Sequence, residues 1–362
     1  MILHRYFARR FFATFLGVLS VFFAMLVFID LIDQVRRFAG APLAQIIGLT
    51  LLNVPQGLYR ILPLIMIIAA IALFLALARS SELVVTRAAG RSALRALLAP
   101  VAVALAIGVV SVAVMNPIVA ATSKEYEARA GNLSGHASVL SIANDGLWLR
   151  QGSDRSQTVI RAGRANLDGT ALQDVSFITF APDGTPARRI EAAAALLTRG
   201  AWALTEAKVW PLAGTDNPEA MAEHHATFEV RSTLTPDQIR DSFGTPSSIP
   251  IWELPRFIER LQAAGFSARR HQVFLQMELA MPVFLVAMVL IAAGFTMRHQ
   301  RGGRTGMMEL AAVLLSFGLY FLRNFAQILG ESGQIPAALA AWAPPLAAIG
   351  LSLGLLLHLE DG

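Results

Sequence analysis

The sequence has no cysteine and almost no lysine. Without thiols the chain has no disulfide, no thiolate metal site and no cysteine nucleophile. Only Lys124 and Lys208 are lysines among its 30 basic residues, and neither lies in a glycine-rich loop that places a lysine on nucleotide phosphates. The chain therefore lacks the site of a P-loop ATPase, and an ATP-driven process would need a partner subunit that binds the ATP.

No other catalytic pattern takes its place. Glu223, His224 and His225 are the nearest approach to a metal cluster, but adjacent imidazoles on a strand point to opposite faces. Residues 131–135 resemble a serine nucleophile turn only superficially, because they miss the Gly-x-Ser-x-Gly spacing. We therefore predict a chain without catalytic residues, metal or cofactor of its own.

Charge is scarce as well. Charged residues make up 15% of the 362 residues and hydrophobic residues 55%, whereas a soluble domain carries about 25% charge. The formal net charge of +5 does not indicate nucleic acid, because the arginines cluster at the ends of apolar runs, as they do in membrane anchors. The composition predicts an integral membrane protein that binds no nucleic acid.

Six apolar stretches are long enough to cross a hydrocarbon core of roughly 30 Å, which takes about 20 helical residues. Three precede and three follow a polar insert, so we divide the chain into residues 1–119, 120–270 and 271–362. The predicted spans are residues 11–31, 46–77, 97–119, 272–297, 307–329 and 335–358.

Prolines interrupt several of these stretches. The second is long enough to need a kink, for which Pro55 and Pro63 offer places. We expect Pro282, Pro344 and Pro345 to break the later helices in the same way, because proline removes a backbone hydrogen bond and clashes with the preceding turn.

Arginine predicts the orientation of the spans. The connections after the second and fourth spans are rich in it, with Arg79, Arg87 and Arg91 in the first and three more within residues 298–304. Because basic connections stay in the cytoplasm, both termini are expected inside and the insert outside. In a Gram-negative cell this is an inner-membrane protein with a periplasmic domain.

The insert carries the pattern of an antiparallel β domain, a sandwich or jelly roll. Apolar and polar residues alternate over short runs, and Asp-Gly pairs such as Asp183 and Gly184 mark tight turns. Residues 251–264 then repeat apolar side chains at helical spacing, which predicts an amphipathic helix on the outer membrane surface. The predicted strands are residues 146–150, 158–161, 175–180, 202–205 and 227–230.

Five charged residues fall inside or near the apolar stretches. They lie close to the predicted helix ends, where long side chains reach the interface. We therefore expect interfacial contacts rather than a proton or ion relay, which disfavours a secondary transporter. These residues are Asp30, Asp33, Arg60, Glu278 and Arg323.

The connection between the second and third spans has the signals of a short helix near residues 81–90. Ser80 or Ser81 would cap its start, Glu82 would complement the positive end of its dipole, and Gly90 would end it. Two readings remain open from these residues. The helix docks in the groove of a partner with Glu82 paired to an arginine there, or it lies on the bilayer.

Two arginines are predicted on the outer side of the membrane, where the positive-inside rule predicts few basic residues. Arg36 and Arg37 lie at the outer end of the first span, and guanidinium groups bind phosphate in a bidentate way. A phosphorylated lipid headgroup from the outer leaflet is one ligand that fits. Ordinary phospholipid contact, or pairing with Asp30 and Asp33, is the other.

Four stretches form a distinctive set of motifs: residues 61–64, residues 81–90, the strand at 146–150 and the tail at 333–344. Together they resemble the motifs of the LptF/LptG (YjgP/YjgQ) family of lipopolysaccharide export permeases. The resemblance covers essentially the whole chain, including the three-plus-three spans and the β insert. Residues 32–37 resemble the LptG branch more than the LptF branch.

The resemblance implies a permease subunit of an ABC exporter that extracts lipopolysaccharide from the outer leaflet of the inner membrane. Its partners would be a paralogous LptF subunit, a dimer of the cytosolic ATPase LptB that binds the ATP, and the periplasmic bridge proteins LptC and LptA. Glu82 would face the ATPase, with Arg87 and Arg91 in the same coupling helix. Alternatives are the LptF branch itself or a mechanotransmission subunit, although the latter has four spans with its large domain after the first.

The resemblance also implies a substrate cavity lined by the first and fifth spans. Arg36 and Arg37 would lie near the phosphates of lipid A. Some relatives carry a basic residue where this chain has Asp30, so no phosphate contact is expected at that position. The acyl chains would lie against Phe317, Tyr320, Phe321 and Phe325.

Overall fold

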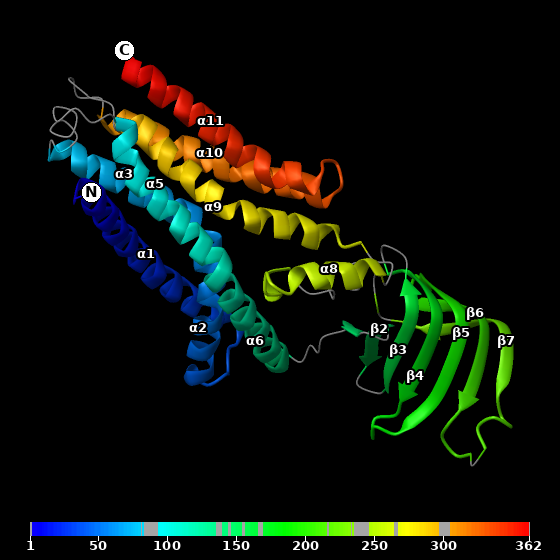
Figure 1. The fold of residues 1–362 in the computed structure, drawn as a ribbon. Coiled ribbons are helices and arrows are strands. Elements are labelled where there is room, and N and C mark those ends of the chain that lie inside the picture. Colours follow the sequence, from blue (N-terminus) through cyan, green and yellow to red (C-terminus); the bar gives the residue numbers. More distant parts are fainter. Residues whose placement is uncertain are drawn as a thin grey trace. The chain divides into compact units, whose positions relative to one another are not determined.

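The chain, described here from a computed structural model, divides into two compact units. The first contains Met1–Ser134, Ser247–Trp252 and Arg269–Gly362, and the second contains Gly135–Pro246 and Glu253–Ala268. Figure 1 shows helices in the first unit and mainly strands in the second. The structure describes residues 2–80, 82, 93–134, 140–143, 146–153, 156–165, 169–215, 217–232, 234, 246–263, 267–296 and 305–361.

Long apolar helices make up the first unit, which we call the membrane unit. Within the described residues six of them are long and apolar enough to cross a membrane. This confirms the prediction of three spans before the insert and three after it. The spans are α1 (Ile2–Arg37), α3 (Leu62–Arg79), the run of α5 (Ala93–Val110), η1 (Ser111–Met115) and α6 (Asn116–Ser134), then α9 (Arg269–Thr296), α10 (Thr305–Glu331) and α11 (Ala337–Asp361).

Helix α9 lies at the centre of the membrane unit, packed against α3, α5, α10 and α11 (Figure 1). Of its most apolar stretch 67% is buried, and α3 follows with 56%. The corresponding shares are 22% for α10 and only 6% for α1. Helices α1 and α10 therefore leave broad apolar surfaces for lipid or for another protein chain.

The predicted second span is two helices in the structure. Helix α2 (Leu43–Arg60) ends before Ile61, and α3 begins at Leu62. Pro63 lies in the first turn of α3, where the missing N–H of proline is not needed for helix hydrogen bonding. The predicted interruption beside Pro63 is confirmed, whereas Pro55 lies inside α2 without ending it.

The prediction that later prolines break their helices is wrong. Helix α9 continues through Pro282, and α11 continues through Pro344 and Pro345. In a membrane bundle, neighbouring helices and local adjustments compensate for the backbone group that a proline frees. Packing against its four neighbouring helices stabilises α9 by more than the loss of one backbone hydrogen bond at Pro282 destabilises it.

A close approach between α5 and α9 depends on Gly108. A Cβ atom at this position would lie 2.5 Å from the Cα and 2.9 Å from the Cβ of Pro282, so the two helices would have to separate. We expect Gly108→Leu to lower the Tm of the purified protein by about 5 °C or more, because overpacking a close contact is destabilising. Gly17→Ala is the control, since nothing lies within 4 Å of a Cβ there, and equal Tm values for Gly108→Leu and the parent would contradict this packing.

The described strands of the second unit form one antiparallel sheet of seven strands in chain order. The antiparallel β insert is confirmed. A sandwich or jelly roll would divide the strands between two sheets, whereas the described strands lie in one sheet. Most connections are so short that strands consecutive in the chain are also neighbours in the sheet. The strands are β1 (Leu140–Ala143), β2 (Gly146–Ser153), β3 (Ser156–Ala165), β4 (Ala171–Phe180), β5 (Pro186–Thr198), β6 (Ala201–Pro211) and β7 (Glu223–Arg231).

One apolar row crosses this sheet. Its members are Leu149, Ile160, Phe177, Ile190 and Val209, which are register partners on five successive strands and are all buried. The alternation that predicted strands therefore reflects one buried face.

Strand β5 is the element that alternation does not predict. Its residues 192–195 are all alanine, and alanine favours helices. However, β5 pairs along its length with β4 and β6, so pairing within the sheet overrides the local helix preference. The turn before it is as predicted, with Gly184 at φ +82° and the Asp183 carboxylate accepting a hydrogen bond from the backbone N–H of Thr185 at 3.0 Å.

Helix α8 (Leu254–Ala263) confirms the predicted amphipathic helix. Leu254, Ile258 and Leu261 are buried, while Glu259 on the other face is exposed. Its position on the membrane surface stays a prediction.

Candidate functional site

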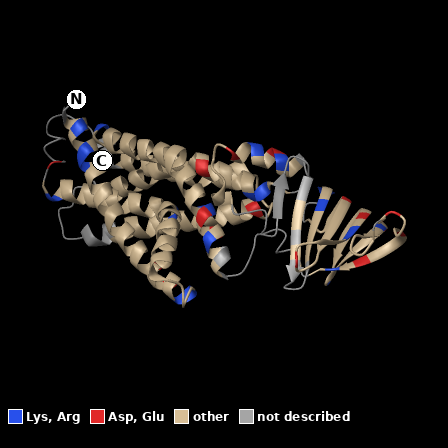
Figure 2. Cartoon of the chain, turned by 90° about the horizontal axis from the view of Figure 1, so that it is seen from below, with Lys and Arg blue, Asp and Glu red and all other residues tan. Residues whose placement is uncertain are grey.

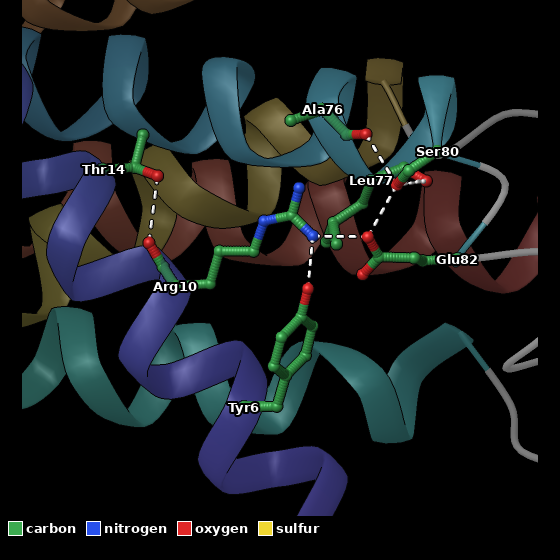
Figure 3. A network of polar contacts seen from close by, with 7 residues as sticks. All are labelled: Tyr6, Arg10, Thr14, Ala76, Leu77, Ser80 and Glu82. Atoms are coloured by element: carbon green, nitrogen blue, oxygen red, sulfur yellow. Dashed lines mark hydrogen bonds and ion pairs between the residues drawn. The ribbon is translucent and has the colours of Figure 1, made fainter.

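Side chains near the N-terminal end of α1 meet the end of α3 in a polar network (Figure 3). The guanidinium of Arg10 donates to a carboxylate oxygen of Glu82 at 2.5 Å and to the hydroxyl of Tyr6 at 2.6 Å. Ser80, which ends α3, donates to the same Glu82 oxygen at 2.8 Å. The network therefore joins α1 to the first residues after α3.

Local helix geometry places these groups. Tyr6 and Arg10 are one helical turn apart, so both side chains lie on the same face of α1. The Ser80 hydroxyl also bonds back to the carbonyl of Ala76 at 2.9 Å, which orients it at the helix end. Glu82 follows two residues later, within reach of both Ser80 and α1.

The network keeps Glu82 ionised. Burial raises the pKa of this carboxyl group, but hydrogen bonds from Arg10 and Ser80 outweigh that effect and hold the pKa below its ordinary value. Both side chains of the Arg10–Glu82 pair are 30% exposed, and pairs of this kind contribute less than about 1 kcal/mol to stability. The pair therefore serves to hold Glu82 in place and contributes little to the free energy of unfolding.

The other end of α1 carries the two predicted arginines. Arg36 and Arg37 occupy the last turn of the helix, where cations complement the negative end of the helix dipole, and both are exposed. The guanidinium of Arg37 lies 5.6 Å from the ring centroid of Phe38. Neither arginine forms an ion pair with a carboxylate in the described part of the chain.

The predicted aromatic side chains of α10 fall on two sides of that helix. Phe317, Phe321 and Phe325 recur every four residues and are 40%, 66% and 58% exposed, so they form one outward stripe. Tyr320 instead packs partly buried against the core of the membrane unit. The structure therefore brings three of the four residues onto a single apolar surface.

The family model for lipopolysaccharide export system permease LptF/LptG matches residues 5–358. The chain belongs to the LptF/LptG family. It is thus a lipopolysaccharide export permease, as the sequence motifs imply.

Relatives of this LptF/LptG permease agree with the assignment. The lipopolysaccharide export system permease protein LptG of Escherichia coli strain K12 is 25% identical over 369 residues, covering 99% of this chain and 98% of that protein. The protein of the same name from Haemophilus influenzae is 25% identical over 370 residues, covering 99% of each chain. The similarity therefore extends over the β insert as well as the spans.

Not every predicted site residue of the LptF/LptG permease can be placed. Glu82 is described, but Arg87, Arg91 and the rest of the short helix predicted near residues 81–90 lie outside the described residues. One of the two sequence readings paired Glu82 with an arginine of another protein, and neither included Arg10 of this chain. The signal in the sequence is the spacing of Tyr6 and Arg10, which lie one helical turn apart at the start of the first span.

The expectation of interfacial contacts is wrong for Glu278. Its side chain is buried inside the membrane unit of the permease, where it accepts hydrogen bonds from the hydroxyl of Tyr59 and from the amide of Asn116, the latter at 3.1 Å. The Asn116 oxygen in turn accepts from the backbone N–H of Ile251 at 2.9 Å. Glu278 lies near the start of α9, which begins at Arg269. It is nevertheless buried, because other helices surround α9 along its length.

Arg323 also points into the bundle rather than to the interface. Its guanidinium lies 5.1 Å from the ring centroid of Phe284, on α9. Figure 2 shows how few other charges lie along the helices of the membrane unit. Glu278, its partners and Arg323 thus form a polar group within an apolar bundle.

Proposed function

We propose that this permease is the LptG-type subunit of an ABC exporter that extracts lipopolysaccharide from the outer leaflet of the inner membrane. It would pair with a paralogous LptF subunit, take its drive from an LptB ATPase dimer that binds the ATP, and deliver the lipid through its β unit to LptC and LptA. Both termini would be cytoplasmic and the β unit periplasmic. The LptG names of its relatives and the Arg-rich connections support this assignment.

The single observation that carries the proposal is the continuity of α1. The helix runs unbroken from Ile2 to Arg37, bonded to Glu82 through Arg10 and ending in the exposed pair Arg36 and Arg37. At 1.5 Å per residue, about 40 Å separate Arg10 from Arg36. One rigid element therefore connects the predicted ATPase-coupling segment to the predicted phosphate-binding arginines.

The exposed surfaces of α1 and α10 support the same proposal. A membrane helix with almost no buried apolar surface needs lipid or another helix beside it, and these are the two least buried spans. The phenylalanine stripe of α10 offers contact to acyl chains. The surfaces fit the walls of a cavity that is completed by a second permease subunit.

Isolation of the tagged chain from Gram-negative membranes tests the assembly. We expect a cytosolic ATPase and one paralogous permease chain to co-purify, and ATP hydrolysis to require that ATPase. Hydrolysis by this chain alone, or isolation of the chain with a second copy of itself as the permease partner, would overturn the proposal.

The double substitution Arg36→Ala, Arg37→Ala tests the substrate contact. Removing two guanidinium groups from the lipid phosphates is expected to lower photocrosslinking of lipopolysaccharide to α1 about tenfold or more, because charge-assisted hydrogen bonds are strong. Arg5→Ala with Arg9→Ala is the matched control, since these exposed arginines belong to the other end of the same helix. Undiminished crosslinking in the first variant would rule out the phosphate role.

A further inference from the structure

Polar side chains line the contact between α1, α2 and α6 near the outer end of α1. The amide of Asn53 on α2 donates to a carboxylate oxygen of Asp30 on α1 at 2.6 Å. The amide nitrogen of Gln34 on α1 donates to the hydroxyl of Tyr126 on α6 at 2.9 Å. Asp30 contacts Asn53, and further along Phe38 clusters with Leu49. Gln34 on α1 and Thr50 on α2 therefore lie at the same level along this pair of helices.

Four side-chain oxygen atoms on these helices are buried and have no hydrogen-bond partner among the described residues. They belong to side chains of all three helices, and three of the four residues are almost completely buried, with Gln34 1%, Thr50 2% and Ser123 3% exposed. Native folds rarely leave such atoms unpaired, so each calls for a ligand. The atoms are Asp30 Oδ2, Gln34 Oε1, Thr50 Oγ1 and Ser123 Oγ.

The two hydroxyl groups differ from others on the membrane helices. Ser20, Ser111 and Ser316 each donate to the carbonyl four residues earlier, at 2.7–2.8 Å, which is the usual arrangement of serine in an apolar helix. Thr50 and Ser123 make no such bond. Their oxygens are therefore available to a ligand between the helices rather than committed to their own backbone.

The chemistry of the four atoms points to a cation. Carboxylate, amide and hydroxyl oxygens are hard ligands, and the single carboxylate of Asp30 balances one positive charge. A divalent ion would draw on more carboxylates than this contact offers. We propose that Asp30, Gln34, Thr50 and Ser123 bind a monovalent cation of sodium's size between α1, α2 and α6.

The surroundings suit an enclosed site with one approach. A small apolar cluster of Phe38, Leu49 and Ala130, with Tyr126 packed against it, covers the contact beyond Gln34. Asp30 is only half-buried, so an ion and its remaining water can reach the carboxylate from that side. A bound cation would hold the outer end of α1 against α2 and α6, next to Arg36 and Arg37.

Thermal unfolding of the purified full-length protein, in the assembly in which it is isolated, tests the site. At equal ionic strength, replacing choline chloride by sodium chloride is expected to raise the Tm saturably, by about 2–4 °C for modest affinity. Asp30→Asn removes the charge and is expected to abolish this rise. A Tm that is the same in sodium, potassium and choline would overturn the proposal in favour of ordered water alone.

Thr50→Val and Ser123→Ala decide the matter if Asp30→Asn fails to fold. A cation site predicts that each loses stability in sodium chloride only, because a ligand oxygen is removed. A contact without a cation predicts an unchanged or higher Tm in every salt, since an unpaired buried hydroxyl is removed without loss. Ser111→Ala is the control and should retain the full effect of sodium, because its hydroxyl bonds to its own helix.

Discussion

Glu82→Lys is expected to abolish export of lipopolysaccharide, with a loss on the order of 100-fold in ATP-driven transfer. The introduced lysine would face Arg10, whose guanidinium now lies 2.5 Å from the carboxylate, so the two cations would repel each other and the side chain at position 82 would leave its present place. In the proposed assembly it would also present the wrong charge to a basic residue of the ATPase. The measurement is release of lipopolysaccharide from proteoliposomes that contain the full exporter.

Arg10→Ala separates positioning from direct contact. If Arg10 only holds Glu82 in place, its removal should lower transfer about fivefold at most, because a part-exposed ion pair contributes less than about 1 kcal/mol. Arg9→Ala is the matched control, an exposed neighbour on the same helix. Normal assembly and transfer with Glu82→Lys would show that neither the ion pair nor a partner contact at Glu82 matters for export.

Glu278→Ala is expected to give the largest loss of stability. It leaves the hydroxyl of Tyr59 and the amide of Asn116 without their shared acceptor inside the membrane unit. Each buried polar group left without its partner costs about 1–3 kcal/mol, so the loss of both contacts corresponds to a fall in Tm on the order of 10 °C. Thermal unfolding of the purified exporter, followed by tryptophan fluorescence, measures this directly.

Two further variants define the cause. Glu278→Gln keeps an acceptor oxygen for Tyr59 or Asn116 and should lose less stability than the alanine variant. Leu279→Ala alters the adjacent side chain, which is 46% exposed, and should change the Tm little. A similar Tm for Glu278→Ala and Leu279→Ala would mean that the buried contacts of Glu278 do not stabilise the bundle.

The membrane architecture could be predicted because it depends on local signals. Apolar length marks the spans, and Asp183 with Gly184 marks a tight turn whichever strands it joins. The amphipathic spacing of Leu254, Ile258 and Leu261 predicts one buried helix face. Each of these signals lies within a few residues of the structure it describes.

Other elements depend on neighbours that are distant in sequence. Strand β5 contains an alanine run, and its pairing with β4 and β6 decides its conformation. Pro282 does not break α9, because that helix is enclosed by four others. In both cases tertiary contacts outweigh a local preference.

In the candidate site, too, some features could be predicted from local sequence and others depend on the fold. Charge and position within the chain were enough to single out Glu82, Arg36 and Arg37, since charged groups beside a membrane are few. Their connection through α1 required the fold, because Arg10 and Glu82 are 72 residues apart and nothing in either local sequence pairs them.

Taken alone, the sequence determined the class of protein, the grouping of spans and insert, and the family, because hydropathy, charge bias and short motifs are properties of contiguous residues. Only the tertiary structure decided which helix is central, that Glu278 is buried, and that four oxygen atoms on α1, α2 and α6 are buried without a hydrogen-bond partner in the described part of the chain. Burial and hydrogen bonding depend on which helices pack together, and that packing is set by the whole membrane unit at once.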